Sequence, residues 1–463
     1  MTGVQTCALP ICTDRFLTSW GSHSAINETN PAIVKIRDLK LKLLKEDMDA
    51  DPRIQLMYAA KYAGTSNYWK YFIGQTRGLK RLDVYEKKKE IENRFSQWVA
   101  QNPQRQEKYG NALGLIQNGL RAQAPFNLPM TYLSEALFQG PEILMMAMRS
   151  SGLIDLLEKM ESAKGKEKEE LQQKVNATIE RIRKRADDFY KDYNLTTDKK
   201  VFSGLLDLYR KDVAPDMQAD IFAMLDKKFK GDFGKWADYV YEKSIFASRE
   251  KLDAFLAKPS AKTLKKDPAI EMALKVRGFY MQFAGQMEAA NVELEKGNRL
   301  FVAGLREMEP NKVYAPDANS TLRMTYGQVL DYYPADAVKY DLVTTLTGVM
   351  EKEDPSNPEF VVDPRLKELY EKKDFGRYAS QIKGRTDIIT CFLTNTDITG
   401  GNSGSPVINA KGELIGIAFD GNWEAMSGDI AFEPELQRTI SVDIRYVLFI
   451  IEKLGRCQRL IDE

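Results

Sequence analysis

Apolar residues recur with a helical period over a long first part of the chain. In the stretch FSGLLDLYR, Phe202, Leu205, Leu206 and Tyr209 follow the spacing i, i+3, i+4 and i+7, which puts them on one face of a helix. A second series keeps this spacing over about five turns, and it comprises Val276, Phe279, Phe283, Met287, Ala290 and Leu294. We expect residues 31–310 to be mainly helical, with these stripes forming a core rather than a cofactor site.

A charged stretch interrupts the apolar stripes. Residues 155–192 are rich in Glu, Lys and Arg, while Val175, Ile182 and Phe189 are seven positions apart. A narrow apolar stripe in a charged sequence is typical of a helix with one solvated face. This stretch therefore predicts a long, partly exposed helical hairpin.

After about residue 312 the period becomes that of strands. In STLRMTYGQV, Leu322, Met324 and Tyr326 alternate with polar residues. VKYDLVTTLTGV is rich in β-branched residues, and both DIITCFLTN and SPVINAKGELIGIAF are expected to form strands, the latter folding back at NAKG. Prolines punctuate a loop-rich connection at Pro355, Pro358 and Pro364, and the final SVDIRYVLFIIEKLG predicts a helix packed on the strands.

Length and charge limit the possible classes of protein. A chain of 463 residues exceeds what one core usually holds, so we expect a helical domain at 13–311 and a strand-rich domain at 312–463. The 67 basic and 66 acidic residues nearly cancel, which gives no electrostatic reason to expect a nucleic-acid partner. No apolar run is long enough to predict a transmembrane helix.

The first twelve residues, MTGVQTCALPIC, match no structural pattern and lack the basic and apolar regions of a signal peptide. They resemble translated adapter or vector sequence, so we expect residues 1–12 to be an artefactual leader, or else a disordered terminus. Cys7 and Cys12 lie in this segment, which leaves Cys391 and Cys457. Two distant cysteines form neither a disulfide framework nor a metal cluster, and we expect both to be core thiols.

The stretch TNTDITGGNSGSPV contains the clearest chemical signal. Ser403 is flanked by Gly400, Gly401 and Gly404, as a nucleophile on a tight turn requires, and strand-like sequence follows directly. In such a turn the backbone N–H groups of Ser403 and Gly401 would face a developing oxyanion. The alternative is a glycine-rich hairpin that merely exposes a serine.

A nucleophilic serine needs a base, and bases are scarce in this chain. The one histidine, His23, lies far from the motif in sequence, and Lys411 lies in a turn that leads away from Ser403. Neither a phosphate-binding loop nor a zinc motif is found, so no cofactor and no metal is expected. The sequence predicts a nucleophile loop without its own general base.

Several stretches together resemble the bacterial dipeptidyl-peptidase 7 and 11 family. They are TDRFLTSWG, NPAIVKIR, YAGTSNYWKYFIGQTRGLKRL, TGGNSGSPV, FDGNWEAMSGDI and SVDIRYVLFIIEK. The resemblance implies an α+β multidomain fold, in which a large all-α domain is followed by the C-terminal β-barrel of a chymotrypsin-like (trypsin-like) double-barrel serine exopeptidase. In the family the catalytic His and Asp precede the helical domain. The chain is therefore expected to be an N-terminally truncated member, inactive by itself, in which His23 is not the base.

The same resemblance predicts how peptides would bind. Phe419, Asp420 and Gly421 are expected at the wall of the S1 pocket. Members that prefer acidic P1 residues carry an arginine where this chain has Gly421, so a hydrophobic or broad P1 preference is expected; the alternative is a glycine required only by strand geometry. Asn67 in SNYWK is the candidate acceptor for the substrate's α-ammonium group, or else a cap or turn residue, beside Tyr68 and Trp69 as packing residues.

Two classes of function remain open. The first is a serine dipeptidyl-peptidase that acts on oligopeptides and is active only as a longer protein. The second is a non-catalytic peptide-binding module on a peptidase-like fold. The resemblance further implies a periplasmic or outer-membrane-associated protein and a possible homodimer.

Overall fold

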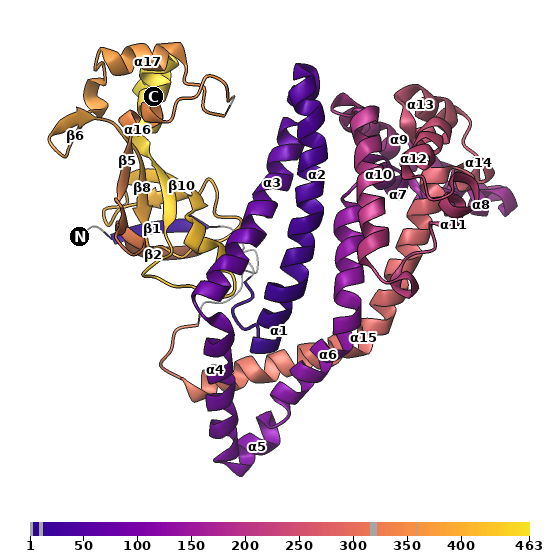
Figure 1. Cartoon of the computed structure of the whole chain (residues 1–463), viewed down its shortest axis with the longest axis horizontal. Helices are drawn as coiled ribbons and strands as arrows, with labels where there is room; N and C mark the ends of the chain where they lie inside the picture. Colours follow the sequence, from indigo (N-terminus) through magenta and orange to yellow (C-terminus); the bar gives the residue numbers. More distant parts are fainter. Residues whose placement is uncertain (1–2, 9–12, 315–321, 358) are drawn as a thin grey trace. The chain divides into compact units, whose positions relative to one another are not determined.

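The computed structural model describes residues 3–8, 13–314, 322–357 and 359–463. The chain forms two compact units (Figure 1). The sheet unit is drawn from residues 1–22, 74–91 and 306–463, and the helical unit from residues 23–73 and 92–305. The sequence-based boundary between residues 311 and 312 lies close to the change at Leu305, while 74–91 and the N-terminal residues pack in the sheet unit. Cys12, Pro358 and the start of the stretch at 320–321 lie outside the described residues.

The helices of the first part of the chain, short and long, lie where the helical period predicts them. Between residues 19 and 308 they are α1 (Ser19–Ser24), α2 (Asn30–Ala50), α3 (Pro52–Arg81), α4 (Val84–Ala100), α5 (Pro103–Tyr109), α6 (Ala112–Tyr132), α7 (Glu142–Ser150), α8 (Gly152–Ser162), α9 (Gly165–Lys191), α10 (Leu195–Asp212), α11 (Ala223–Phe229), α12 (Phe233–Lys243), α13 (Arg249–Ala257), α14 (Ala261–Lys265) and α15 (Pro268–Met308). Short π-helical segments follow α1 (Ala25–Thr29) and α6 (Leu133–Phe138). A mainly helical region is therefore confirmed.

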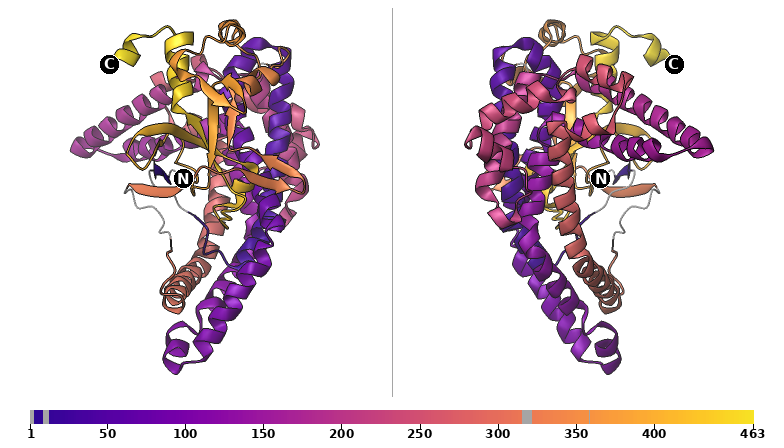
Figure 2. Two further views of the ribbon diagram at one scale, coloured as in Figure 1. Left: turned by 90° about the vertical axis from the view of Figure 1, so that its left-hand side faces the viewer. Right: turned by 90° about the vertical axis from the view of Figure 1, so that its right-hand side faces the viewer.

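The apolar stripes lie where the periodicity places them. On α10, Phe202, Leu205, Leu206 and Tyr209 are all fully buried. On α15, Val276 and Phe283 are buried in the same core. Helices α8 and α9 pair as the expected hairpin, which can be followed in the two views of Figure 2, and α9 buries Val175 and Ile182 along one face.

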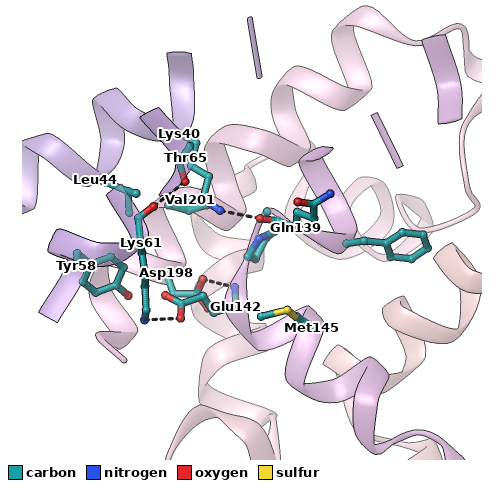
Figure 3. A pocket seen from close by; sticks show the side chains of 13 residues that line it. Lys40, Leu44, Tyr58, Lys61, Thr65, Gln139, Glu142, Met145, Asp198 and Val201 are labelled. Atoms are coloured by element: carbon teal, nitrogen blue, oxygen red, sulfur yellow. Dashed lines mark hydrogen bonds and ion pairs between the residues drawn. The ribbon is translucent and has the colours of Figure 1, made fainter. Parts of the chain in front are cut away.

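A buried carboxylate organises the centre of the helical unit. Helix α7 begins after Pro141, whose side chain cannot cap it, and Asp198 of α10 accepts the free N–H groups of Glu142 (2.6 Å) and Ile143 (3.0 Å) instead. The Tyr241 hydroxyl donates a third hydrogen bond to Asp198 at 2.7 Å. Burial, reinforced by the nearby Glu142 carboxylate, raises the pKa of Asp198 to about 7. Figure 3 shows Asp198 and Glu142 side by side.

The raised pKa of Asp198 makes the stability of this region depend on pH. The folded protein holds a proton on Asp198 up to about pH 7, whereas the unfolded chain loses it near pH 4. The contribution of Asp198 to stability is therefore fully present below about pH 4 and is lost as the pH rises towards about 7. We expect the opening free energy of α7 and α10, measured by hydrogen exchange, to fall by about 2–3 kcal/mol between pH 5 and pH 8. The Asp198→Asn variant should show a flatter profile; an equally steep one would contradict this origin.

The sheet unit contains a seven-stranded antiparallel sheet in the order β2-β1-β9-β10-β11-β8-β5. Its strands are β1 (Gly3–Ala8), β2 (Arg323–Gln328), β5 (Val343–Thr345), β8 (Ile389–Thr394), β9 (Pro406–Ile408), β10 (Leu414–Gly421) and β11 (Thr439–Asp443). Two hairpins accompany it, β3 (Tyr332–Ala335) with β4 (Val338–Tyr340) and β6 (Ser380–Ile382) with β7 (Arg385–Asp387). A helical region plus a β-sheet domain is thus confirmed, and the chymotrypsin-like barrel stays a prediction.

Short helices close one end of the sheet unit. They are α16 (Leu346–Glu351), α17 (Pro364–Glu371), α18 (Ile444–Phe449), with a π-helical turn at Ile450–Leu454, and α19 (Arg459–Asp462). Leu346, Leu366, Phe375 and Phe449 meet in a shared apolar core. Among the residues with described placement, no helix has the length and apolar character required to cross a membrane.

Three sequence-based expectations differ from the structure. The helix predicted for SVDIRYVLFIIEKLG starts only at Ile444, because Ser441–Asp443 complete β11 between β10 and β8, and the Asp443 side chain caps α18 by accepting the Arg445 N–H. The stretch VKYDLVTTLTGV forms two short strands and then turns into α16. Cys457 is exposed rather than a core thiol, because it lies in the connection between the π-helical turn at Ile450–Leu454 and α19, whereas Cys391 is half-buried on β8.

The leader expected to be artefactual or disordered also contains regular structure. Gly3–Ala8 form β1, which pairs antiparallel with β2 and with β9. The alternating residues of β2 are Met324 and Tyr326, and both are exposed. Strand alternation is therefore present at 322–328, but its apolar side is not covered by described residues.

Candidate active site

Ser403 lies on the loop that connects β8 to β9, in the sheet unit. Its side chain is exposed, and the glycines around it adopt backbone angles that favour glycine: φ is +108° at Gly401 and +87° at Gly404. A residue with a Cβ atom would be strained at either position. The glycine spacing read from the sequence thus has a conformational reason, because it lets the chain turn sharply on both sides of Ser403.

The buried side chain of Asn402 stabilises this loop by hydrogen bonds within it. Its side chain is only 1% exposed, and its Oδ1 accepts the Thr399 N–H at 3.2 Å. Its backbone N–H donates to Thr399 O (3.2 Å), and its carbonyl accepts the Ser405 N–H (2.9 Å). The structure identifies it as the residue that closes the turn beneath Ser403.

The loop is joined to β10 beside Ser403. The Gly404 N–H donates to Ala418 O at 2.8 Å, and the Ala418 N–H donates to Ser405 O at 3.0 Å. The pairing of β10 with β11 shifts between Ala418 and Asp420, so Phe419 occupies a bulge. Its carbonyl accepts the Ser403 hydroxyl at 3.3 Å. Ser403, predicted as the nucleophile, and Phe419, predicted as a residue of the S1 wall, therefore lie in contact.

Two backbone N–H groups of the Ser403 loop are candidates for oxyanion donors. Within the described part of the chain, the N–H groups of Gly401 and Ser403 have no hydrogen-bond partner, whereas those of Asn402, Gly404 and Ser405 are bonded. Unpaired N–H groups on an exposed loop can serve an anionic ligand. They are the same two groups that the sequence motif indicated as oxyanion donors.

No described residue of the sheet unit is bonded to Ser403 as a base. The bond from the Ser403 hydroxyl to Phe419 O is the one hydrogen bond that the described residues offer this side chain. His23 is exposed on α1 and belongs to the helical unit. Lys411 is exposed in the turn after β9, where Asn409 Oδ1 accepts its backbone N–H at 2.9 Å.

Gly421, at the end of β10, is closely packed. A Cβ atom added there would lie 2.9 Å from the Ala425 Cβ, in the 3-10 turn formed by Trp423–Ser427. The neighbouring Asp420 is exposed, and its Oδ1 accepts the Gly421 N–H at 2.8 Å. This contact gives Gly421 a packing reason in addition to any role in a pocket, so the alternative recognised from the sequence has a physical basis.

Two buried polar residues near the end of β10, Asn422 and Arg438, were not predicted from the sequence. Arg438 is 4% exposed and donates to four backbone carbonyls, those of Asp331, Pro434, Glu435 and Gln437, while burial lowers the pKa of its guanidinium group. Asn422 accepts the N–H groups of Ala425 (3.1 Å) and Arg438 (2.9 Å) and donates to Leu436 O (2.8 Å). The sequence feature that could have drawn attention to Asn422 was its position in FDGNWEAMSGDI, one of the stretches that resemble the family.

An ion pair connects the TDRFLTSWG stretch to the start of the nucleophile loop. Arg15 and Asp397 form two contacts, of 2.5 and 2.7 Å, and Arg15 Nε also donates to Gly428 O at 3.2 Å. The Asp397 N–H donates in turn to the Thr325 hydroxyl at 3.0 Å. Two stretches that carried the family resemblance, TDRFLTSWG and FDGNWEAMSGDI, therefore meet in the sheet unit although about 400 residues separate them, and Asp397 joins them just before the nucleophile loop.

Asn67, the candidate ammonium acceptor, is exposed in the middle of α3 and belongs to the helical unit. It is not a helix cap or turn residue, because α3 extends well beyond it on both sides. Trp69 is half-buried, and its Nε1 is buried with no hydrogen-bond partner among the residues that the structure describes. Tyr68, expected to pack, is 56% exposed and lies under the Arg37 guanidinium.

The fold and the loop define a peptidase-like class, in which a β-sheet unit presents a serine between two glycines with positive φ and the same chain also forms a helical unit. The sequence model described as Peptidase S46 matches residues 4–463, and the chain belongs to this family.

Relatives and solved structures agree with this family. Dipeptidyl-peptidase 7 of Porphyromonas gingivalis is 45% identical over 99% of this chain, and the Asp/Glu-specific dipeptidyl-peptidase of the same species is 38% identical over 98%. The crystal structure of Porphyromonas endodontalis DPP11 in complex with the dipeptide Arg-Glu matches the whole chain, with a TM-score of 0.87 and 33% identity. The chain spans 62%, 61% and 64% of the lengths of these proteins, respectively.

Proposed function

We propose that the whole protein is a serine dipeptidyl-peptidase that releases dipeptides from the N-termini of oligopeptides. The observation that carries this proposal is the loop geometry at Ser403, where an exposed hydroxyl lies between two left-handed glycines and beside two unpaired N–H groups. Relatives named dipeptidyl-peptidase 7 and Asp/Glu-specific dipeptidyl-peptidase support the reaction class.

In the proposed mechanism, the Ser403 Oγ gives its proton to a base and bonds to the carbonyl carbon of the second peptide residue. The tetrahedral intermediate then breaks the peptide bond, the base protonates the leaving amine, and water hydrolyses the acyl-enzyme to release the dipeptide. The Gly401 and Ser403 N–H groups would stabilise the oxyanion, which is the largest contribution expected of this loop. The Ser403 hydroxyl would first leave Phe419 O. That bond costs little to break, because 3.3 Å is long for an O–H···O hydrogen bond.

We further propose that a histidine and an aspartate supplied by a part of the whole protein outside this chain activate Ser403. They would belong to the first barrel of a chymotrypsin-like pair, of which the sheet unit is the second. The exposed Met324 and Tyr326 on β2 fit a face that packs against another domain. The resemblance is likewise the basis for proposing a periplasmic or outer-membrane-associated location.

For substrate recognition, we propose that Phe419, Asp420 and Gly421 line S1, with a hydrophobic or broad P1 preference. Gly421 adds no charge to this wall, and the higher identity to a dipeptidyl-peptidase 7 than to an Asp/Glu-specific relative favours the same conclusion. The exposed amide of Asn67 is proposed as an acceptor for the free α-ammonium group.

The test uses the whole protein with paired peptides that have a leucine in the second position, one with a free N-terminus and one N-acetylated. We expect intact dipeptides to be released from the free peptide, with at least a hundredfold lower kcat/KM for the acetylated one, because a lost ammonium contact leaves its acceptor unpaired. Mass spectrometry of the products identifies the cleaved bond. Binding of both peptides without cleavage would instead favour the non-catalytic peptide-binding module.

A further inference from the structure

A cavity of about 200 Å³ lies within the helical unit, between α2, α3, α7 and α10 (Figure 3). Water occupies about 30 Å³ per molecule, and pockets for drug-sized ligands usually exceed about 300 Å³. The space therefore suits a molecule of roughly six to ten non-hydrogen atoms. None of its lining residues belongs to the Ser403 loop.

Three of the four ionisable groups in the cavity wall have their hydrogen-bonding and charge partners within the protein itself. The Lys61 ammonium pairs with Glu142 at 2.6 Å and lies 4.4 Å from the centre of the Tyr58 ring. Asp198 accepts its three hydrogen bonds from Glu142, Ile143 and Tyr241. These groups have little capacity left for a ligand.

Lys40 differs from the other three. Its Nζ donates to Gln139 O at 2.6 Å, and among the described residues no carboxylate lies within ion-pair distance of it. An ammonium group has three donors, so two remain. Burial lowers the pKa of Lys40 despite the opposing influence of Glu142 and Asp198, which indicates an ammonium that the surrounding protein compensates incompletely.

Apolar side chains form another part of the wall, with Leu44 on α2, Met145 on α7 and Val201 on α10, while Thr65, whose hydroxyl donates to Lys61 O at 2.9 Å, adds a polar side chain. We propose that this cavity binds a small organic carboxylate, whose oxygens accept hydrogen bonds from Lys40 and whose short apolar body lies against Leu44, Met145 and Val201. A phosphate would require more donors, and the N–H groups that begin α7 are already bonded to Asp198. A cation would find both carboxylates occupied.

Three probes of the same shape but different charge test whether the cavity prefers an anion, a neutral molecule or a cation. Isovalerate, isovaleramide and isopentylamine are titrated against the 463-residue chain, with binding followed by saturation-transfer NMR. We expect isovalerate to bind with a Kd of about 1 mM or tighter, and the amide at least about tenfold more weakly, because it loses the charge-assisted contact. Equal binding of all three, tightest binding of the amine, or no binding of isovalerate would overturn the proposal.

Variants of one helix then assign the contact to Lys40. Lys40→Met should weaken isovalerate binding at least about tenfold, whereas Lys40→Arg keeps the charge and should retain most of it. Lys45→Met is the matched control, because Lys45 is exposed on the same helix and pairs with Asp49 outside the cavity. Unchanged binding in a folded Lys40→Met variant would overturn the proposal; if this variant does not fold, the three probes on the unaltered chain decide.

Discussion

Replacing Ser403 by alanine is expected to lower the kcat of the whole protein by about 10⁴–10⁶-fold, because the variant loses the attacking oxygen while the loop keeps its shape. The Ser403 side chain makes a single long hydrogen bond, to Phe419 O, so its removal should leave the melting temperature nearly unchanged. The measurement is single-turnover and steady-state hydrolysis of a dipeptidyl substrate with leucine at P1.

Ser405→Ala is the matched control for this prediction. Ser405 lies two residues further along the same loop, and it is bonded through its backbone to Asn402 and Ala418. Its replacement should therefore leave kcat within about the same order of magnitude. Retained activity in Ser403→Ala would remove this residue as nucleophile. Robust cleavage by the purified 463-residue chain, abolished by Ser403→Ala, would show that the chain contains its own base.

Gly421→Arg is expected to move the P1 preference of the whole protein from leucine towards aspartate. A guanidinium at the pocket wall offers paired donors to a carboxylate and places an unpaired charge beside an apolar side chain. One charge-assisted contact should change the ratio of the two kcat/KM values by roughly ten- to a hundredfold, or about 1.5–3 kcal/mol. The measurement is kcat/KM for two substrates that differ only at P1.

The packing of Gly421 determines the controls for this experiment. Any side chain there brings a Cβ within 2.9 Å of the Ala425 Cβ, so Gly421→Ala measures the steric cost alone. The double variant Gly421→Arg/Ala425→Gly relieves that contact and should show the larger shift in preference. If the leucine-to-aspartate ratio does not move in either folded arginine variant, Gly421 does not line S1.

The sequence predicted secondary structure correctly where apolar residues keep one period along a whole element. The i, i+3, i+4, i+7 spacing around Phe202 and Leu206 predicts a helix because one face is buried along its whole length. The same reasoning failed at Ser441–Asp443, where the apolar positions Ile440, Val442 and Ile444 continue across the junction of β11 with α18. The available signal was Asp443, whose side chain caps the helix; a capping residue inside an apolar run marks the change from strand to helix.

The residues of the candidate site likewise divide into those that the sequence pattern reveals and those that only the folded structure reveals. Glycines with positive φ leave a visible pattern, so Gly401, Ser403 and Gly404 could be found from spacing alone. Asn402 and Arg438 could not, because their roles depend on carbonyl and N–H groups brought together only by folding. Close packing of Gly421 against Ala425 likewise involves a turn whose position the sequence does not state.

The sheet unit is assembled from segments that are far apart in the sequence, and this has a consequence for how the chain folds. Arg15 is held by Asp397 and Gly428, and an added Cβ at Gly78 would meet Ser427, so contacts in this unit join residues separated by more than 340 positions. Contacts over such distances form slowly, because long loops must close before any stabilisation is gained. The contiguous residues 92–305 of the helical unit can associate earlier during synthesis. The nucleophile loop is therefore among the last parts of the protein to reach its final shape.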